Sequence, residues 1–186
     1  MTAKKDNIFI RVVLDPKTFT DFSVFNTFIR NKNLKQPLLF MGIMILFAVV
    51  CFLSGKPQGT MTGIILTIAG LALPAYSLLR FIGSTRASIK AHGLPRAAYE
   101  ILLTGNTAEI KSLAESGDSV SIKWEDFHHA YRNTHCIYLY LMPQRAFLLP
   151  DGQAEGASTE EVWDWLVTHM ETEKISDVRK SASSRS

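Results

Sequence analysis

The chain has 186 residues, a formal net charge of +3 at pH 7 and hydrophobic side chains at 47% of its positions, which allows one domain in addition to membrane-spanning segments. No Asp or Glu lies between Asp21 and Glu100, whereas residues 97–174 hold thirteen acidic residues against five basic ones: Lys111, Lys123, Arg132, Arg145 and Lys174. That acidic excess argues against a nucleic-acid partner for the distal part of the chain.

Residues 1–36 predict a strand followed by a helix. Apolar residues alternate from Ile8 to Leu14, the pattern of a half-buried strand. Asp15 and Pro16 then suit the N-cap and first turn of a helix. Its apolar residues recur at spacings of three and four: Phe19, Phe22, Phe25, Phe28 and Ile29. Two interpretations remain open: this helix lies in the membrane interface, or it packs on the cytoplasmic domain.

Residues 37–83 predict a transmembrane hairpin, with spans at 38–54 and 60–81. Each apolar run has about the length that a bilayer core requires of a helix, and a short loop joins them. Lys56 in that loop is the only charge between Leu38 and Leu79. A buried helical pair of a soluble protein is the alternative, but such helices are usually shorter and carry a polar stripe. Gly63, Ala69 and Gly70 offer a weak face for close helix contact.

Basic residues flank the hairpin and predict its orientation. Arg30, Lys32 and Lys35 precede the first span, and a basic connector at 84–96 follows the second. Because positive residues near span ends stay cytoplasmic, we expect both termini inside and Lys56 outside. The first apolar run begins too late for a cleavable signal peptide. We expect four residues after the second span to contact anionic lipid: Arg80, Arg86, Lys90 and Arg96.

Residues 97–174 predict a β meander closed by a helix. Alternating runs separated by turn residues give six expected strands, at 98–104, 107–113, 119–124, 127–132, 135–142 and 145–150. Ser158 and Glu161 predict a capping box for a helix that extends to Lys174. We place Ile8–Leu14 in the same sheet as residues 98–149, which makes the hairpin an insertion. Residues 175–186 are poor in apolar side chains, so we expect disorder there.

This order of parts resembles the YcxB-like family of bacterial membrane proteins. The resemblance rests on Trp124, which opens a short strand, on the aromatic–aliphatic strand from Ile137 to Leu141, and on the ending Leu149-Pro150. It implies an α+β membrane protein: a two-helix transmembrane hairpin with a cytoplasmic domain like a pleckstrin-homology (PH) domain, an antiparallel meander or partly open barrel closed by the C-terminal helix. It also implies the bacterial inner membrane. The family's basic pair after the proline is replaced here by Asp151-Gly152.

Candidate chemical sites are few. His128, His129, His135 and Cys136 are the residues that suggest a metal, but His128 and His129 point to opposite faces of a strand and no spacing matches a zinc motif. We therefore favour ordinary strand-edge histidines, and we expect no cofactor. Cys51 and Cys136 are expected to be free, buried thiols. No P-loop, GxGxxG, GxSxG or HExxH motif occurs.

These observations favour a non-enzymatic, multi-pass membrane protein that presents a PH-like domain to a protein partner or a second copy of itself. Five basic residues among thirteen acidic ones argue against phosphoinositide binding by that domain. Transport is disfavoured because the spans lack ionisable residues and two helices enclose no pore. The alternative is a small accessory subunit of a transporter or membrane enzyme, acting through its hairpin.

Overall fold

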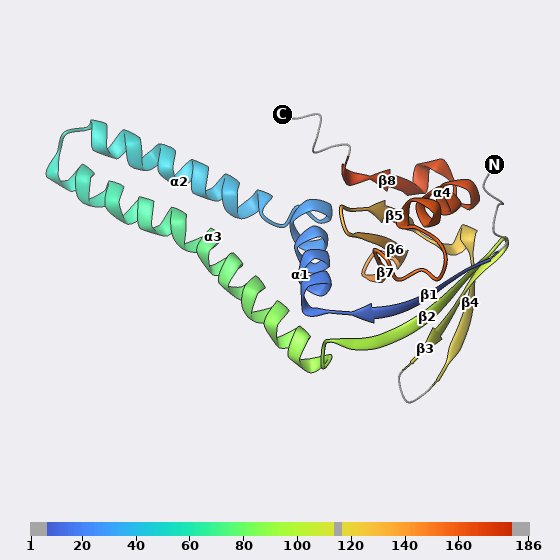
Figure 1. The fold of residues 1–186 in the computed structure, drawn as a ribbon. Coiled ribbons are helices and arrows are strands. Elements are labelled where there is room, and N and C mark those ends of the chain that lie inside the picture. The colour runs from blue at the N-terminus through green and yellow to red at the C-terminus, as the bar shows by residue number, and fades with distance from the viewer. Residues whose placement is uncertain (1–6, 114–116, 180–186) are drawn as a thin grey trace. The chain divides into compact units, whose positions relative to one another are not determined.

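The computed structural model describes residues 7–113 and 117–179, and the chain divides into two compact units. One, which we call the β unit, combines residues 1–22 with 94–186; the other, the hairpin unit, is Ser23–Gly93. Figure 1 shows the elements of both units, an α+β set with two long apolar helices and two β-sheets. The described strands form no closed barrel.

The hairpin unit consists of η1 (Phe25–Arg30), α2 (Lys35–Leu53) and α3 (Pro57–Ala91). The predicted spans at 38–54 and 60–81 lie within α2 and α3, except that Ser54 caps α2. At 1.5 Å per residue, 19 residues make α2 about 28 Å long and 35 residues make α3 about 52 Å long. The extra length of α3 is the basic connector, whose helix runs unbroken from the second span to Ala91.

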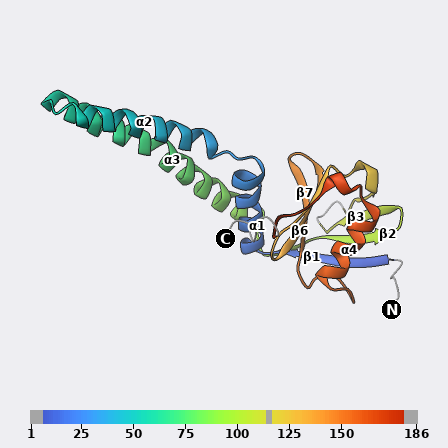
Figure 2. The same ribbon diagram turned by 90° about the horizontal axis from the view of Figure 1, so that it is seen from above.

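The two long helices pack antiparallel to each other, as both views show (Figures 1 and 2). Glycines permit the close approach. A Cβ atom added to Gly70 would lie 2.9 Å from the Cβ of Met44, and one added to Gly63 would lie 2.8 Å from the Phe52 ring. Of the three small residues that the sequence offered for helix contact, Gly63 and Gly70 are therefore used inside the hairpin, whereas Ala69 is exposed.

The β unit contains two four-stranded sheets. The first, in the order β1-β2-β3-β4, is antiparallel throughout and consists of β1 (Asn7–Leu14), β2 (Arg96–Thr104), β3 (Thr107–Ser112) and β4 (Ser119–Lys123). The second, in the order β7-β6-β5-β8, consists of β5 (His129–Arg132), β6 (Cys136–Met142), β7 (Arg145–Pro150) and β8 (Ile175–Asp177). Its pairs are antiparallel except for β5 with β8, which is parallel.

The predicted N-terminal strand pairs with β2, in a register that sets Ile10 opposite Ile101. This pairing confirms that the hairpin is inserted between two neighbouring strands. The prediction of a single sheet for residues 8–14 and 98–149 is wrong, because the chain crosses to a second sheet after β4. That crossing is the 3-10 turn η2 (Trp124–Asp126), where a strand ending at Trp124 was expected.

One hydrophobic core fills the β unit. Ile8, Ile10 and Val12 of β1 are buried in it together with the inward side chains of both sheets. Helix α4 (Thr159–His169) contributes Val162, Trp163, Trp165 and Leu166. The predicted capping box is present: the Glu161 amide donates to Ser158 Oγ at 3.2 Å, and the Ser158 amide donates to the Glu161 carboxylate at 2.7 Å.

The helix was predicted to reach Lys174 but ends at His169. Met170 is extended, with φ −106° and ψ 154°, and its side chain is buried in the core. Beyond it only polar residues remain up to Lys174, so a further helical turn has no apolar face to bury. These residues form the 3-10 turn η3 (Thr172–Lys174).

The expectation of disorder from residue 175 onward is wrong for Ile175–Asp177, which form β8. Local composition predicts no order there, but the exposed edge of β5 supplies backbone partners and Ile175 packs on the core. The expectation is also wrong for Val178 and Arg179, which the structure describes as half-buried, and residues 180–186 lie outside the described residues.

Helix α1 (Pro16–Val24) follows β1, and the Asp15 carboxylate caps it by accepting the Thr18 amide at 2.6 Å. Within the β unit, the Phe22 ring contacts Tyr138 at 5.3 Å and Tyr140 at 6.2 Å between centroids. Tyr138 and Tyr140 are fully buried, on the face of β6 opposite the core residues Ile137 and Leu139. This end of the helix thus packs on the second sheet, one of the two interpretations open from the sequence.

Candidate membrane surface and interaction sites

The most conspicuous surface of the hairpin unit is apolar. Large aliphatic side chains are exposed along both helices, for example Leu39 at 67% and Leu53 at 81% on α2, and Met61 and Leu79, each at 69%, on α3. A long core helix of a soluble protein is mostly buried, whereas only Ala48 is buried on α2. Both helices are long and apolar enough to cross a membrane.

The four basic residues predicted to contact lipid are all exposed. Arg80, Arg86 and Lys90 lie on the C-terminal part of α3, within the hairpin unit. Arg86 and Lys90 are four residues apart and share a helix face, while Arg80 and Lys90 are about 15 Å apart along the axis. Arg96 begins β2 and belongs to the β unit. None of the four forms an ion pair with another described residue.

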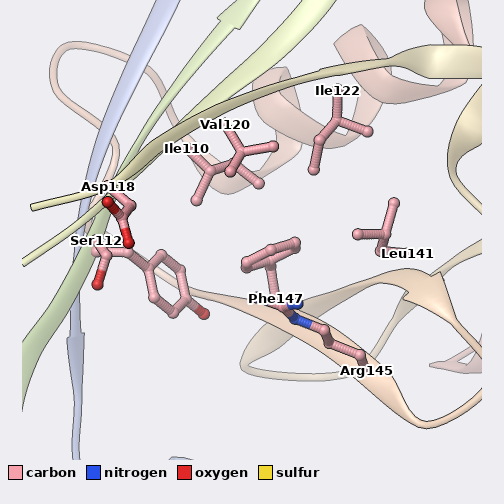
Figure 3. A pocket seen from close by; sticks show the side chains of 9 residues that line it. Ile110, Ser112, Asp118, Val120, Ile122, Leu141, Arg145 and Phe147 are labelled. Carbon is pink, nitrogen blue, oxygen red and sulfur yellow. The ribbon is translucent and has the colours of Figure 1, made fainter. Parts of the chain in front are cut away.

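The β unit has an apolar cleft of about 380 Å³ between its two sheets (Figure 3). Ile110, Val120 and Ile122 of the first sheet face Leu141 and Phe147 of the second across it. Asp118 and Arg145 lie at its two sides, and the Arg145 guanidinium is 5.8 Å from the centre of the Phe147 ring. Val120 faces this cleft and is 55% exposed.

The cleft wall is fixed by Tyr99, whose hydroxyl donates to the Leu148 carbonyl at 3.0 Å and accepts from the Leu148 amide at 2.6 Å. Its ring meets Phe147 edge-on at 5.5 Å. Burial raises the pKa of the Tyr99 hydroxyl far above its ordinary value, so this group stays protonated and structural. The cleft offers apolar contact and two opposite charges, and its nine lining residues include no histidine or cysteine.

The histidines and Cys136 do not converge on a site. Within the described residues, no group of three His, Cys, Asp or Glu side chains is placed to hold a metal. Both cysteines are free; Cys136 is buried as expected, but Cys51 is only half-buried because it lies on the surface of α2. Burial raises the pKa of the Cys136 thiol strongly, which disfavours the reactive thiolate.

Trp124 and Pro150, two of the residues on which the family resemblance rests, have structural roles in the β unit. The Trp124 indole donates to the Thr104 carbonyl at 3.0 Å and packs against Phe127 and Trp165, with centroids at 5.5 and 5.0 Å. It ties the crossing between the sheets to β2 and to α4. Pro150 ends β7 opposite Cys136 of β6.

A cluster that the sequence analysis missed joins β5, α4 and β8. Arg132 of β5 is only 4% exposed and pairs with Glu160 in the first turn of α4. Its guanidinium lies 5.7 Å from the centre of the Trp163 ring. Arg179 also pairs with Glu160 at 3.4 Å and with Asp177 at 2.9 Å. We call these four charged residues, Arg132, Glu160, Asp177 and Arg179, the ion-pair cluster.

The cluster shifts both of its carboxyl groups in the same direction. The hydrogen bond from Arg132 is the largest cause that lowers the pKa of Glu160 below its ordinary value. The hydrogen bond from Arg179 does the same for the pKa of Asp177. A signal was present in the sequence: alternation puts Arg132 on the same face as the core residue Ala130, and an inward arginine requires a carboxylate partner.

Comparisons of the chain with known protein families, with curated proteins and with solved structures found no match.

Proposed function

We propose that this protein is anchored in a membrane by α2 and α3 and presents the β unit for binding to another protein, without enzymatic activity. The observation that carries the proposal is the exposed apolar surface of the two long helices, in a chain whose β unit has its own buried core. Water is an unfavourable solvent for so continuous an apolar surface, whereas lipid tails solvate it.

We further propose that the β unit is a PH-like domain and that the chain is a YcxB-like protein. The element order supports this assignment: four antiparallel strands, a crossing, three more antiparallel strands and a helix that packs on the core. Strand β1 supplies the seventh strand of that arrangement, from the other side of the inserted hairpin.

The proposed orientation places the loop with Lys56 outside and both termini in the cytoplasm of a bacterial cell, in the inner membrane. The distribution of basic residues supports this orientation. Several precede α2 or follow the apolar part of α3, whereas the loop between the helices has a single lysine, and basic residues near span ends stay cytoplasmic.

Thiol labelling tests this orientation. In a chain carrying Cys51→Ala and Cys136→Ala, a single cysteine is placed by Gln58→Cys or, in the exposed turn after β7, by Asp151→Cys. An impermeant maleimide should label the first in intact cells, and the second only after the membrane is opened. Labelling of Asp151→Cys in sealed cells would contradict the orientation, and release of the protein by carbonate washing would contradict insertion.

The accessory-subunit alternative places the partner on the hairpin. Its support is the same exposed aliphatic surface, but the close-packing positions Gly63 and Gly70 are already occupied within the hairpin. Purification in mild detergent separates the two proposals. A partner retained by residues 23–93 alone favours the accessory subunit, and one that requires the whole chain favours the β unit.

A further inference from the structure

Strand β8 is the smallest element of the second sheet and occupies the edge of β5. It pairs in parallel with Ala130–Arg132 over three residues (Figure 1). All three of its residues are only partly buried. It follows α4 after the short η3 turn, so a single brief segment fills the edge that β5 would otherwise leave unpaired.

Ile175 and Asp177 of β8 lie on the same face, where Ile175 contacts the core and Asp177 belongs to the ion-pair cluster. Ile175 lies opposite Ala130 and packs against the hydrophobic core. Asp177 lies opposite Arg132, two positions further along the same face. Asp177 accepts from Arg179 Nε at 3.1 Å and from Nη2 at 2.9 Å, which holds the guanidinium so that Nη1 lies 3.4 Å from the Glu160 carboxylate.

If β8 leaves the sheet, the groups that it contacts on the rest of the β unit keep interactions of their own. Arg132 stays paired with Glu160 and stacked near Trp163, so its buried charge keeps a partner. The exposed Glu160 in the first turn of α4 pairs with Arg132 of β5 and with Arg179, and its carboxylate therefore favours a basic residue on whatever strand lies at this edge. A three-residue parallel pairing with one core contact belongs to the weakly held end of a structure.

We propose that the edge of β5 beside α4 is a strand-binding site for an extended segment of a partner protein, and that β8 occupies this site in cis until the partner displaces it. The chemistry of β8 defines the segment: an aliphatic residue for the core, an acidic residue two positions later, and an arginine after another two that pairs with Glu160. Backbone pairing along an open sheet edge supplies affinity, and the alternate side chains supply specificity. The site rests on the proposed function, since it is the place where the β unit would bind its partner.

A partner of another sequence fits better than exchange of β8 between two copies. Met170 is buried in the core, and five residues from Glu171 to Ile175 span at most about 17 Å. Exchange would require two β units to approach within that reach while each kept its Met170 anchor.

The test uses a fluorescein-labelled peptide with the sequence of residues 171–182 and the full chain in detergent micelles. Ile175→Ala with Arg179→Ala weakens the cis strand while Arg132 and Glu160 stay in place. We expect this variant to bind the peptide at least ten-fold more tightly than the unaltered chain does, because a tethered strand competes at an effective concentration in the millimolar range. A peptide carrying the same two alanines should not bind.

The matched control is Arg11→Ala with Val13→Ala, which removes an arginine and an aliphatic side chain from β1, both exposed. It should bind the peptide as weakly as the unaltered chain. Equal binding by all three proteins, or no binding by the Ile175→Ala/Arg179→Ala variant with native tryptophan fluorescence, would overturn the proposal. If that variant unfolds, Arg179→Ala alone carries the same test. If the variant forms a dimer at higher protein concentration and does not bind the peptide, the proposal is also overturned, in favour of exchange of β8 between two copies. None of these outcomes bears on the labelling and purification tests of the proposed function, because those tests use a chain in which β8 and the edge of β5 are unaltered.

Discussion

Ile10→Ala tests whether the strand that precedes the hairpin belongs to the core of the β unit. Ile10 is 1% exposed, pairs with Ile101 of β2 and bridges to Ala154. Truncating a fully buried isoleucine costs about 2–5 kcal/mol, through lost burial and the cavity left behind. Val13 lies on the same strand but is 42% exposed, so Val13→Ala is a matched control with an expected cost within about 0.5 kcal/mol.

Urea unfolding in micelles, followed by tryptophan fluorescence, measures this difference. All three tryptophans of the chain, Trp124, Trp163 and Trp165, are buried in the β unit, so the signal reports that unit alone. With a slope of about 2 kcal/mol per molar urea, a loss of about 3 kcal/mol lowers the midpoint by about 1.5 M. Coinciding midpoints for Ile10→Ala and Val13→Ala would refute the inclusion of β1 in this core.

Three further predictions concern the hairpin, the basic residues and the ion-pair cluster. Gly70→Ala should destabilise the helix pair by about 1–3 kcal/mol, because the added Cβ would lie 2.9 Å from the Cβ of Met44. Gly42→Ala is the control, since a Cβ added there meets nothing within 4 Å. Thermal melting in detergent, followed by circular dichroism, compares the two variants, and equal melting temperatures would refute the close packing. Arg80, Arg86, Lys90 and Arg96 are together replaced with glutamine. This change should weaken binding to anionic lipid by about 1 kcal/mol per well-placed cation, so less anionic lipid should co-purify, and the urea midpoint should not change. Undiminished anionic lipid would show that these residues do not bind it. In the folded protein the pKa values of Glu160 and Asp177 lie below their ordinary 4.5 and 3.8. The ionised carboxylates therefore stabilise the fold fully at a pH above those ordinary values, and this stabilisation is lost as the pH falls through the lowered pKa values. The protection of the Ile175–Asp177 amides against hydrogen exchange, corrected for the intrinsic exchange rate at each pH, should therefore fall below about pH 4 and stay constant above pH 5, and Glu160→Gln should reduce this acid step; a change in protection between pH 5 and 7 would contradict the assignment.

The sequence by itself determined the elements whose signals are local. The two apolar runs predict α2 and α3 because lipid-compatible helices need a continuous apolar stretch of known length. Alternation predicts the strands of the meander within a few residues, and the Ser158–Glu161 spacing predicts the start of α4. Burial also predicted that β1 joins the strands that follow the hairpin, since its alternating apolar face needed cover, but it did not identify β2 as the partner.

Tertiary structure decided what depends on partners distant in the chain. Strand β4 ends at Lys123 and Trp124 begins a turn because the chain must cross between two sheets there, and α4 stops at His169 because Met170 turns into the core. Ile175–Asp177 carry too little apolar surface to order themselves, yet they form a strand where the edge of β5 supplies backbone partners and Arg179 reaches Glu160. Composition within a short window cannot reveal such order, because the groups that stabilise it lie some 15 to 45 residues earlier in the sequence, on β5 and α4.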